Sequence, residues 1–167
     1  MKRVEFSNYN GLPHLITDCI VDTELAIEWL KKVLDEKKKT RKTQPYNIIV
    51  LDTFSDIVVS DHRKDFINLI NEILSEGSDL GIYLVMYDSR VGEEVFDSTF
   101  ILGFKTLICF ATTDKAGSKL LINSDDGHYL LGKGDMLLLR GNQDNPVRIQ
   151  APFVSRDEIV KLVKKMW

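Results

Sequence analysis

One acidic side chain lies where an α/β protein can bind a metal ion together with a phosphate. Asp52 ends the apolar segment 48–52 and is followed by Thr53-Phe-Ser-Asp56. A strand of this kind presents its last side chain at the carboxyl edge of a sheet, where a carboxylate can hold Mg²⁺ in the Walker B arrangement. A strand-end aspartate also commonly caps a turn, here with Ser55 or Asp56 as its partner. From the residues alone, both interpretations stay open.

A nucleotide site of this type also needs a segment that surrounds the phosphates. The usual pattern is Gly-x-x-x-x-Gly-Lys-Ser/Thr, which this sequence does not contain. The nearest glycine cluster, Gly132-Lys-Gly-Asp135, precedes a predicted strand and opens no helix. Because no helix N-terminus directs its amides there, we expect a turn and not a phosphate site.

The other reactive residue types favour structural roles. His14, His62 and His128 are scattered along the chain and have no metal-ligand spacing, so we expect surface or turn residues. Cys19 and Cys109 each lie in an apolar stretch, which favours buried, reduced thiols over a disulfide framework or a zinc site. Asp52 therefore remains the main chemical candidate that the pattern alone provides.

The elements that must position Asp52 follow from the hydrophobic pattern. Apolar runs predict strands covered on both faces at 47–51, 82–86 and 106–110, and a terminal hairpin of 136–139 and 147–150 turned by 141–146. Helical stripes separate these strands. Buried strands that alternate with amphipathic helices predict an α/β fold with a mostly parallel sheet flanked by helices, followed by a C-terminal β-hairpin and helix.

Three helices have recognisable ends or faces. Asp22 or Thr23 can cap the first, and Ser155-Arg-Asp-Glu158 matches a capping box for the last, with Ile159, Leu162 and Val163 facing inward. The middle helix ends near Gly77. The apolar stripes of the first two helices are Leu25, Ala26, Trp29, Leu30, Val33 and Leu34, and Phe66, Leu69, Ile70, Ile73 and Leu74.

Composition sets the class of the molecule. The 167 residues carry 22 Lys and Arg against 25 Asp and Glu, a net charge of −3, which excludes a compact basic nucleic-acid module. The basic run 37–42 follows a helix, and we interpret it as a solvated helix end. No apolar run is long enough to cross a membrane, so we expect a cytoplasmic protein of one domain, residues 1–167.

Several phrases, taken in order, resemble the RecA-like motor domain of the FtsK/SpoIIIE family of DNA translocases. The resemblance covers almost the whole chain, and its most specific phrase is Leu130-Leu-Gly-Lys-Gly-Asp-Met-Leu137. The other phrases are Lys2-Arg-Val-Glu-Phe-Ser-Asn-Tyr-Asn-Gly-Leu-Pro-His-Leu15, the strand ending at Asp52, Gly81-Ile-Tyr-Leu-Val-Met86, Pro146-Val-Arg148 and Ala151-Pro-Phe-Val-Ser155.

The resemblance implies where a nucleotide would bind. The matched part is the second part of the motor domain, so the family's P-loop would lie upstream of Met1. On this basis Asp52 is a Walker B remnant and a candidate Mg²⁺ ligand. Arg90, Lys115 and Lys119 are further candidate nucleotide-binding residues. ATP and Mg²⁺ are expected cofactors only in a complete assembly, and none is expected for this chain alone.

Differences from the family fall at the positions that the resemblance assigns to catalysis. The family's Glu after the Walker B aspartate is Thr53 here, and a hydroxyl is a poor proton acceptor near pH 7. The family's Thr-Gln-Arg-Pro reads Asp88-Ser-Arg-Val91, which retains only Arg90. The segments 59–64 and 91–95 would line the DNA channel, yet the second is acidic and unsuited to tracking phosphates.

Three hypotheses follow. The first is a degenerate, non-catalytic FtsK/SpoIIIE-like module that acts as a scaffold or regulatory part of a DNA-translocation or secretion-type assembly. The second is the C-terminal part of an ATP-driven DNA translocase, with DNA bound only in a ring assembly. The third is a small α/β binding protein whose likeness to translocases is ancestral only.

All three hypotheses share one physical consequence. Without the family's P-loop part, one side of the sheet would keep an apolar surface or an open edge. We therefore expect self-association, a protein partner, or rearranged elements that protect the sheet.

Overall fold

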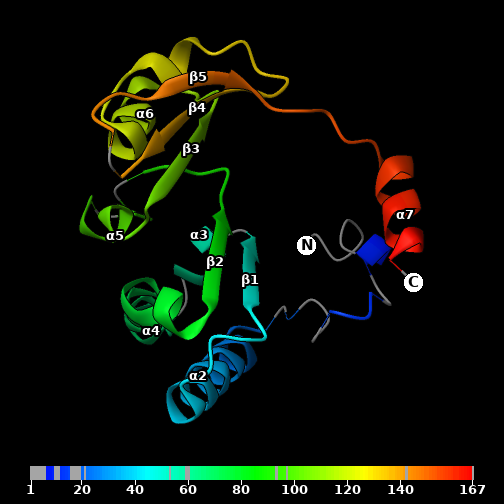
Figure 1. Cartoon of the computed structure of the whole chain (residues 1–167). Coiled ribbons are helices and arrows are strands. Elements are labelled where there is room, and N and C mark those ends of the chain that lie inside the picture. Colours follow the sequence, from blue (N-terminus) through cyan, green and yellow to red (C-terminus); the bar gives the residue numbers. More distant parts are fainter. Residues whose placement is uncertain are drawn as a thin grey trace.

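A computed structural model describes residues 7–9, 12–15, 20, 22–52, 54–58, 61–92, 94–96, 98–141 and 143–166 (Figure 1). Strands and helices alternate along most of the chain, which confirms an α/β fold. In order, the elements are η1 (Ser7–Tyr9), α2 (Thr23–Thr40), β1 (Asn47–Asp52), α3 (Phe54–Val58), α4 (Arg63–Glu76), η2 (Gly77–Leu80), β2 (Ile82–Tyr87), α5 (Ser98–Leu102), β3 (Thr106–Phe110), α6 (Lys115–Ile122), η3 (Asp126–Tyr129), β4 (Asp135–Arg140), β5 (Val147–Gln150) and α7 (Arg156–Lys165).

The strands form two small sheets and not one. β1 and β2 pair in parallel, with Asn47 opposite Ile82 and Asp52 opposite Tyr87. β3, β4 and β5 form an antiparallel sheet in that order. The prediction of a mostly parallel sheet is therefore wrong for the described strands, although the predicted C-terminal hairpin is confirmed as β4 and β5.

The cause of this error lies in the segment between β3 and β4. An apolar run such as 106–110 shows that a strand is buried, but not which way its neighbour runs. After α6 the chain turns through η3 and three consecutive residues of positive φ, Gly132, Lys133 and Gly134. It then enters β4 antiparallel to β3, so α6 is not part of a parallel crossover.

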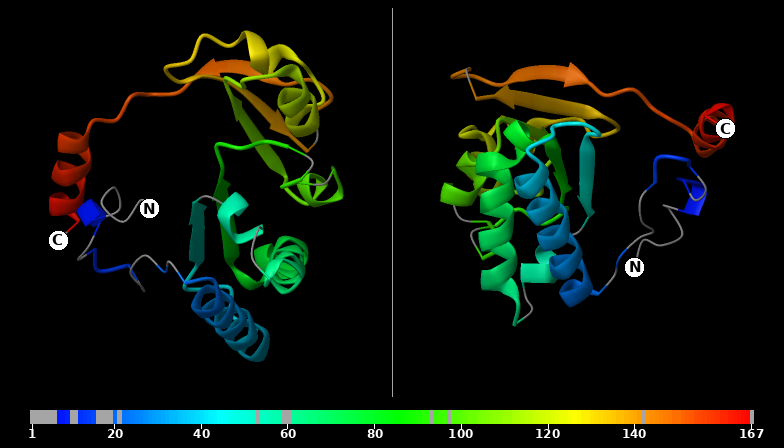
Figure 2. Two further views of the ribbon diagram at one scale, coloured as in Figure 1. Left: turned by 180° about the vertical axis from the view of Figure 1, so that it is seen from behind. Right: turned by 60° about the horizontal axis from the view of Figure 1, so that its bottom comes forward.

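Among the residues that the structure describes, helices cover one face of the β1–β2 sheet and leave the other open. Seen from behind, α3 lies in front of the two strands, α4 packs against α3, and α2 packs against α4 (Figure 2). Ile49 and Ile82 point into this covered side, whereas Ile48, Val50 and Val85 are more than half exposed on the other. The prediction that these strands are covered on both faces is wrong, and the expected apolar surface is present.

A group of phenylalanines forms the centre of the main core. Phe54 has no exposed surface and stacks on Phe96 and Phe100 at centroid distances of 5.3 and 5.1 Å. Phe66 from α4 packs against it from another side. Because Phe54 is the first residue of α3, and Phe66 and Phe100 lie on α4 and α5, this packing holds α3 against those two helices.

The three predicted helix ends are confirmed. The Asp22 side chain accepts a hydrogen bond from the Leu25 amide, and Ser155 and Glu158 form the predicted capping box. Gly77 ends α4 but keeps right-handed helical angles, and the chain continues as η2. The left-handed turn falls at Gly81, where a side chain would collide with the backbone of Thr43.

The basic run after α2 is not uniformly solvated. Lys37 is only 8% exposed, and its ammonium donates to the carbonyl oxygens of Lys42, Thr43 and Pro45. Lys38 instead pairs with Glu72 and Glu76 on α4. The interpretation of a solvated helix end is therefore wrong for Lys37, which ties the turn before β1 to α2.

The last helix lies apart from the two sheets. An extended segment, residues 151–155, leads from β5 to α7, which packs against η1 near the N-terminal part of the chain (Figure 1). Val163 is buried in this contact, but Leu162, which the capping-box analysis placed inward, is 57% exposed. In the described part of the chain, no helix is both long and apolar enough to cross a membrane.

Candidate functional site

The parallel register of β1 and β2 brings several polar residues to one edge of the sheet. Asp52 is the last residue of β1 and lies opposite Tyr87, the last residue of β2. Asp88 follows directly, and Arg90 comes two residues later. Ligands of open α/β sheets bind outside the carboxyl ends of the strands, so this edge is the candidate site.

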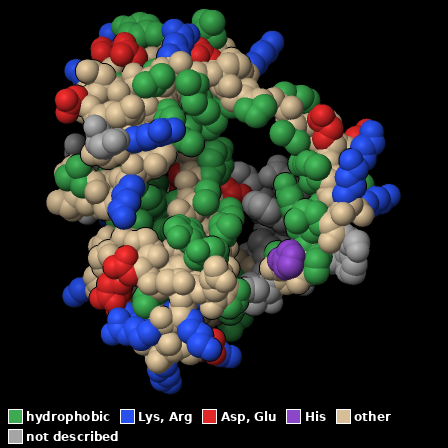
Figure 3. All heavy atoms as spheres, in the orientation of Figure 1, with side chains coloured by type: hydrophobic (Ala, Val, Ile, Leu, Met, Phe, Trp, Pro, Cys, Tyr) green, Lys and Arg blue, Asp and Glu red, His purple; other side chains and the backbone are tan. Residues whose placement is uncertain are grey.

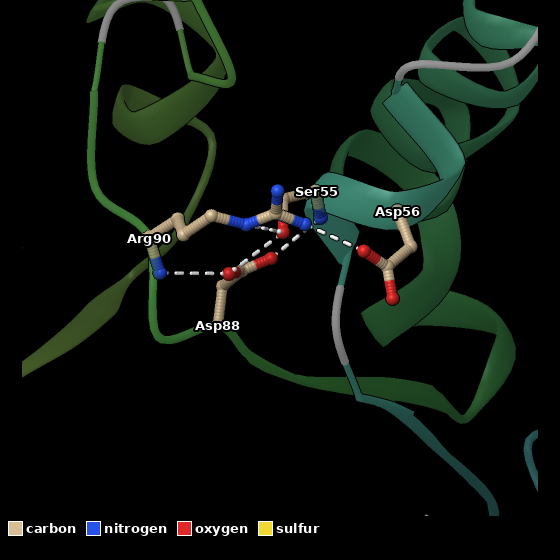
Figure 4. Close-up of polar contacts among 4 residues, drawn as sticks. All are labelled: Ser55, Asp56, Asp88 and Arg90. Atoms are coloured by element: carbon tan, nitrogen blue, oxygen red, sulfur yellow. Dashed lines mark hydrogen bonds and ion pairs between the residues drawn. The ribbon is translucent and has the colours of Figure 1, made fainter. Parts of the chain in front are cut away.

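Asp88 holds the start of α3 against the end of β2 (Figure 4). One carboxylate oxygen accepts from the Ser55 amide, and the other accepts from the Ser55 hydroxyl at 2.9 Å and from the Arg90 amide at 2.9 Å. The Ser55 side chain is almost completely buried. Asp88 therefore occupies its oxygens in fixing local structure.

The Arg90 guanidinium points toward α3 in the same network. Its Nε donates to the Ser55 hydroxyl at 2.9 Å, and its Nη2 donates to the Asp56 carboxylate (Figure 4). Arg90 and Asp56 are 56% and 68% exposed, so water screens their ion pair. The guanidinium therefore pairs with residues of α3, and the predicted role of Arg90 in nucleotide binding stays a prediction.

Asp52 itself is half-buried at the end of β1, while Thr53 lies outside the described residues. The Ser55 amide and hydroxyl bind Asp88. The turn-cap role of Asp52 stays a prediction. The Mg²⁺ role of Asp52 stays a prediction. In the described part of the chain, no cluster of three His, Cys, Asp or Glu is placed to hold a metal ion.

A single carboxylate is nevertheless chemically suited to Mg²⁺. This ion usually keeps several waters and is held by one or two carboxylates together with substrate phosphates. Asp52 supplies one such carboxylate, and the exposed Asp56 carboxylate lies at the start of the neighbouring helix. When bound, the metal ion would neutralise phosphate charge.

Lys115 and Lys119 lie on α6, which begins beside the segment that follows β2. A side-chain carbon at Gly117 would come within 3.1 Å of the Val91 carbonyl oxygen, so α6 approaches the residue after Arg90 closely. The Lys115 ammonium, however, lies over the Tyr129 ring and 3.6 Å from Asp125. Contact with Tyr129 raises the pKa of Lys115, and the proximity of Asp125 contributes to the same shift.

Lys119 is exposed on α6, four residues after Lys115. Its backbone carbonyl accepts from the Asn123 amide at the helix end. The structure thus brings the start of α6 close to the Arg90 segment, but it directs the Lys115 side chain to η3. The nucleotide-binding roles of both lysines stay predictions.

The glycine cluster before β4 is a structural turn. Gly132, Lys133 and Gly134 all have positive φ. Asp135 accepts from the Leu131 amide and from both Nε and Nη2 of Arg148 on β5. The Arg148 guanidinium, helped by the Leu131 amide, lowers the pKa of Asp135 to about 2.

Sequence reasoning missed both aspartate networks. The sequence does contain a signal for each. Asp88-Ser-Arg after a strand is a typical side-chain-to-backbone turn, and Asp135 and Arg148 lie diagonally across a hairpin whose register places Arg148 opposite Leu137.

The two segments expected to line a DNA channel are joined by one contact in their described residues. Arg63 donates to the Glu94 carbonyl oxygen at 3.1 Å. Val59, Ser60 and Glu93 lie outside the described residues. This hydrogen bond joins a basic side chain of one segment to the backbone of the other. The role of the two segments in binding DNA stays a prediction.

The histidines and cysteines fit the structural roles expected of them where they are described. His62 lies 3.0 Å from Glu24, and the His128 ring packs against Tyr129. Cys109 is buried and free, and burial raises the pKa of its thiol. Cys19 lies outside the described residues.

Sequence comparison finds relatives of almost the whole chain, although no protein-family model matches it. The chain is 30% identical to the DNA translocase FtsK of Borreliella burgdorferi, over 99% of this chain and 24% of that protein. It is 27% identical to the DNA translocase SpoIIIE of Bacillus subtilis, over 97% of this chain and 24% of that protein. The chain thus spans about a quarter of the length of these curated relatives.

Solved structures share the fold. The conjugation coupling protein TcpA of pCW3, in a monomer form with ATPγS, matches with a TM-score of 0.73 at 17% identity, over 98% of this chain and 55% of that one. The type VII secretion ATPase EccC of Thermomonospora curvata matches with a TM-score of 0.61 at 20% identity, over 86% of this chain and 19% of that one. Nearly the whole chain is therefore homologous to one part of the FtsK/SpoIIIE family DNA translocases.

Proposed function

We propose that this chain is a non-catalytic FtsK/SpoIIIE-like ATPase module that acts as a scaffold or regulatory part of a DNA-translocation or secretion-type assembly in the cytoplasm. The observation that carries the proposal is the set of residues at the carboxyl ends of β1 and β2, which we call the strand-end edge. Thr53 follows Asp52, and the only residue retained from the family's polar phrase, Arg90, binds Ser55 and Asp56.

The chemistry of phosphoryl transfer explains why these changes matter. Hydrolysis needs a residue that orients the attacking water and cationic groups that meet the phosphate charge. A threonine hydroxyl cannot accept a proton usefully near pH 7. Arg90 would have to leave both Ser55 and Asp56 before it reached a phosphate, so the edge favours a structural role.

Nucleotide binding without turnover fits the same residues. Asp52 would hold Mg²⁺, and Arg90, Lys115 and Lys119 would provide positive charge toward the phosphates. Lys119 would do so as a point charge, without the two-pronged geometry of arginine. The assembly that completes such a site would contain ATP and Mg²⁺, and this chain by itself would bind neither.

A second candidate function is that of the C-terminal part of an ATP-driven DNA translocase. The observation in its favour is that the chain spans about a quarter of relatives named DNA translocases. In that case a longer protein would supply the phosphate-binding segment, and DNA would be bound in a ring assembly.

Steady-state ATP hydrolysis with Mg²⁺ separates these candidates when it is measured on the complete assembly that contains this chain, with and without duplex DNA. The non-catalytic module predicts no hydrolysis above a matched Asp52→Ala variant under either condition. Turnover that DNA stimulates and Asp52→Ala abolishes would contradict it and favour the translocase. Thr53→Glu sharpens the result, because a gain of turnover on restoring the acid would show that the rest of the site is intact.

A further inference from the structure

The turn that follows α2 presents several exposed cations. Lys37 and Lys38 are engaged, the first with backbone carbonyl oxygens and the second with Glu72 and Glu76 of α4. The other basic side chains of the segment 37–42 are exposed and form no hydrogen bond or ion pair with the residues that the structure describes: Lys39, Arg41 and Lys42. Lys and Arg side chains gather over α2 in the lower part of Figure 3.

The backbone of this turn is held in place by the packing beneath it. The buried Lys37 ammonium binds three backbone carbonyl oxygens of the turn, and the Arg41 amide donates to the Lys37 carbonyl at 2.9 Å. On the other side, Gly81 lies so close to the Thr43 backbone that a side chain would not fit between them. Only the three cationic side chains therefore have to be ordered when a ligand binds, which lowers the entropic cost of binding.

The turn lies at the opposite end of β1 from the strand-end edge. It precedes Asn47, the first residue of β1, whereas Asp52 ends that strand about 16 Å further on. The three cations are therefore separate from Asp52 and Arg90, and a ligand of the turn would be distinct from a nucleotide at that edge.

Acidic side chains border the turn, and they select the kind of anion that it can bind. Glu76 pairs with Lys38, and Asp79 lies just before Gly81. The whole chain carries a net charge of −3. A nucleic acid is commonly held through about six to ten phosphates and would meet these carboxylates as well as the cations. A short acidic peptide needs to contact only the turn.

From this arrangement we propose that Lys39, Arg41 and Lys42 form a docking surface for a short segment of a protein partner that is rich in Asp and Glu. Carboxylates of the segment accept hydrogen bonds from the two ammonium groups, and the Arg41 guanidinium binds one carboxylate through two parallel hydrogen bonds. The proposal does not depend on whether the module binds or hydrolyses ATP, because the turn shares no residue with the strand-end edge.

The test is a titration of the ¹⁵N-labelled 167-residue chain with acetylated hexaglutamate, followed by heteronuclear NMR, which measures weak binding and locates it. At about 20 mM NaCl we expect saturable shifts centred on the amides of residues 38–45, and we expect the affinity to fall as salt is added. Combining Lys39→Glu, Arg41→Glu and Lys42→Glu reverses the three charges. This triple variant should bind hexaglutamate about tenfold more weakly, or less tightly still.

Two further variants make the result specific. The matched control reverses three exposed cations at the end of α7 and so changes the net charge by the same amount: Lys161→Glu, Lys164→Glu and Lys165→Glu. It is expected to leave the affinity for hexaglutamate unchanged. A triple Gln variant at the turn removes the charges without adding repulsion: Lys39→Gln, Arg41→Gln and Lys42→Gln. It keeps the test valid if the triple Glu variant does not fold, as judged by circular dichroism.

Several outcomes would overturn the proposal. A wild-type chain without saturable shifts would do so, as would shifts that lie away from residues 38–45. An equal loss of affinity in the α7 control would show that net charge, and not the turn, attracts the peptide. Tighter binding of a short duplex DNA, lost in the same turn variants, would overturn the proposal in favour of a nucleic-acid surface.

Discussion

Two aspartates, Asp88 and Asp135, hold turns in the two sheets of this protein in similar ways but with different consequences. Asp88 accepts from Ser55 and from the Arg90 amide after β2, and Asp135 accepts from the Leu131 amide and the Arg148 guanidinium before β4. Asp135 lies in a phrase that keeps the family pattern, whereas Asp88 lies in one that departs from it.

Under the function that we propose, the difference is that of a scaffold that persists while a catalytic edge changes. The network around Asp135 joins β4 to β5 and fixes a turn, so its role is structural. The network around Asp88 lies at the strand ends, where the resemblance expects a polar sensor, and there it too fixes a turn. The same local chemistry thus fixes a turn in each sheet, and at Asp88 it does so where the resemblance predicts ligand-binding groups.

The largest expected effect tests whether the packing of Phe54 anchors α3, the helix that carries Ser55 and Asp56. Phe54→Ala removes a fully buried ring that stacks on Phe96 and Phe100. We expect a loss of about 3–5 kcal/mol in the free energy of unfolding, measured by urea denaturation. Phe153→Ala, at an 89% exposed site, is the control and should change little. Equal stability of the two variants would show that α3 is not anchored as described.

Removing the carboxylate of Asp88 is expected to have the next largest effect. Asp88→Ala leaves the Ser55 amide and the buried Ser55 hydroxyl without their carboxylate acceptor. The loss of this cap should cost about 1–2 kcal/mol in urea denaturation. Asp88→Asn, which keeps one acceptor oxygen, should cost less, and the reverse order would contradict the assigned hydrogen bonds.

Lowering the pH should reveal the contribution of Asp135 to the stability of the fold. The pKa of Asp135 is about 2 in the folded protein and 3.8 as its ordinary value, so its ionised form stabilises the fold above about pH 4. That contribution is lost as the pH falls from 4 toward 2. Thermal melting of Asp135→Asn should show a lower Tm at pH 7 and a shallower decline below pH 4 than the wild type. Parallel pH profiles would refute the ion pair with Arg148.

The smallest expected effect concerns Arg90. Its guanidinium pairs with Asp56 at the surface, where both side chains are more than half exposed. Arg90→Ala should therefore lower the free energy of unfolding by no more than about 1 kcal/mol. A larger loss of unfolding free energy in urea denaturation would mean that Arg90 stabilises the fold as much as Asp88 does. It would contradict the description of Arg90 as a surface ion pair.

The sequence predicted the elements better than their assembly. All five strands and the capping box at Ser155 lie where local patterns placed them, since these signals depend on neighbouring residues. The direction of β4 and the exposure of Val50 and Val85 depend on which helices and turns pack nearby, which periodicity does not encode. Likewise, nothing in the basic run distinguishes Lys37, whose burial follows from the path of the turn before β1.

For the site, sequence reasoning placed Asp52 and Arg90 at one edge of a sheet, and the parallel register of β1 and β2 does so. It did not predict that the Asp88 carboxylate, which the same register brings to this edge, accepts a hydrogen bond from the Ser55 hydroxyl. The difference arises because that hydrogen bond joins residues 33 positions apart, and its partner could be identified only once β1 and β2 were paired.

The central claim, that the strand-end edge of this chain serves structure and by itself holds no nucleotide, is tested most directly by calorimetric titration of Mg-ATP into the chain, with Asp52→Ala as the matched variant. The account predicts no saturable heat up to millimolar nucleotide for either protein. Saturable binding to the wild type that Asp52→Ala abolishes would contradict it, and would show that Asp52 holds the metal of a working nucleotide site.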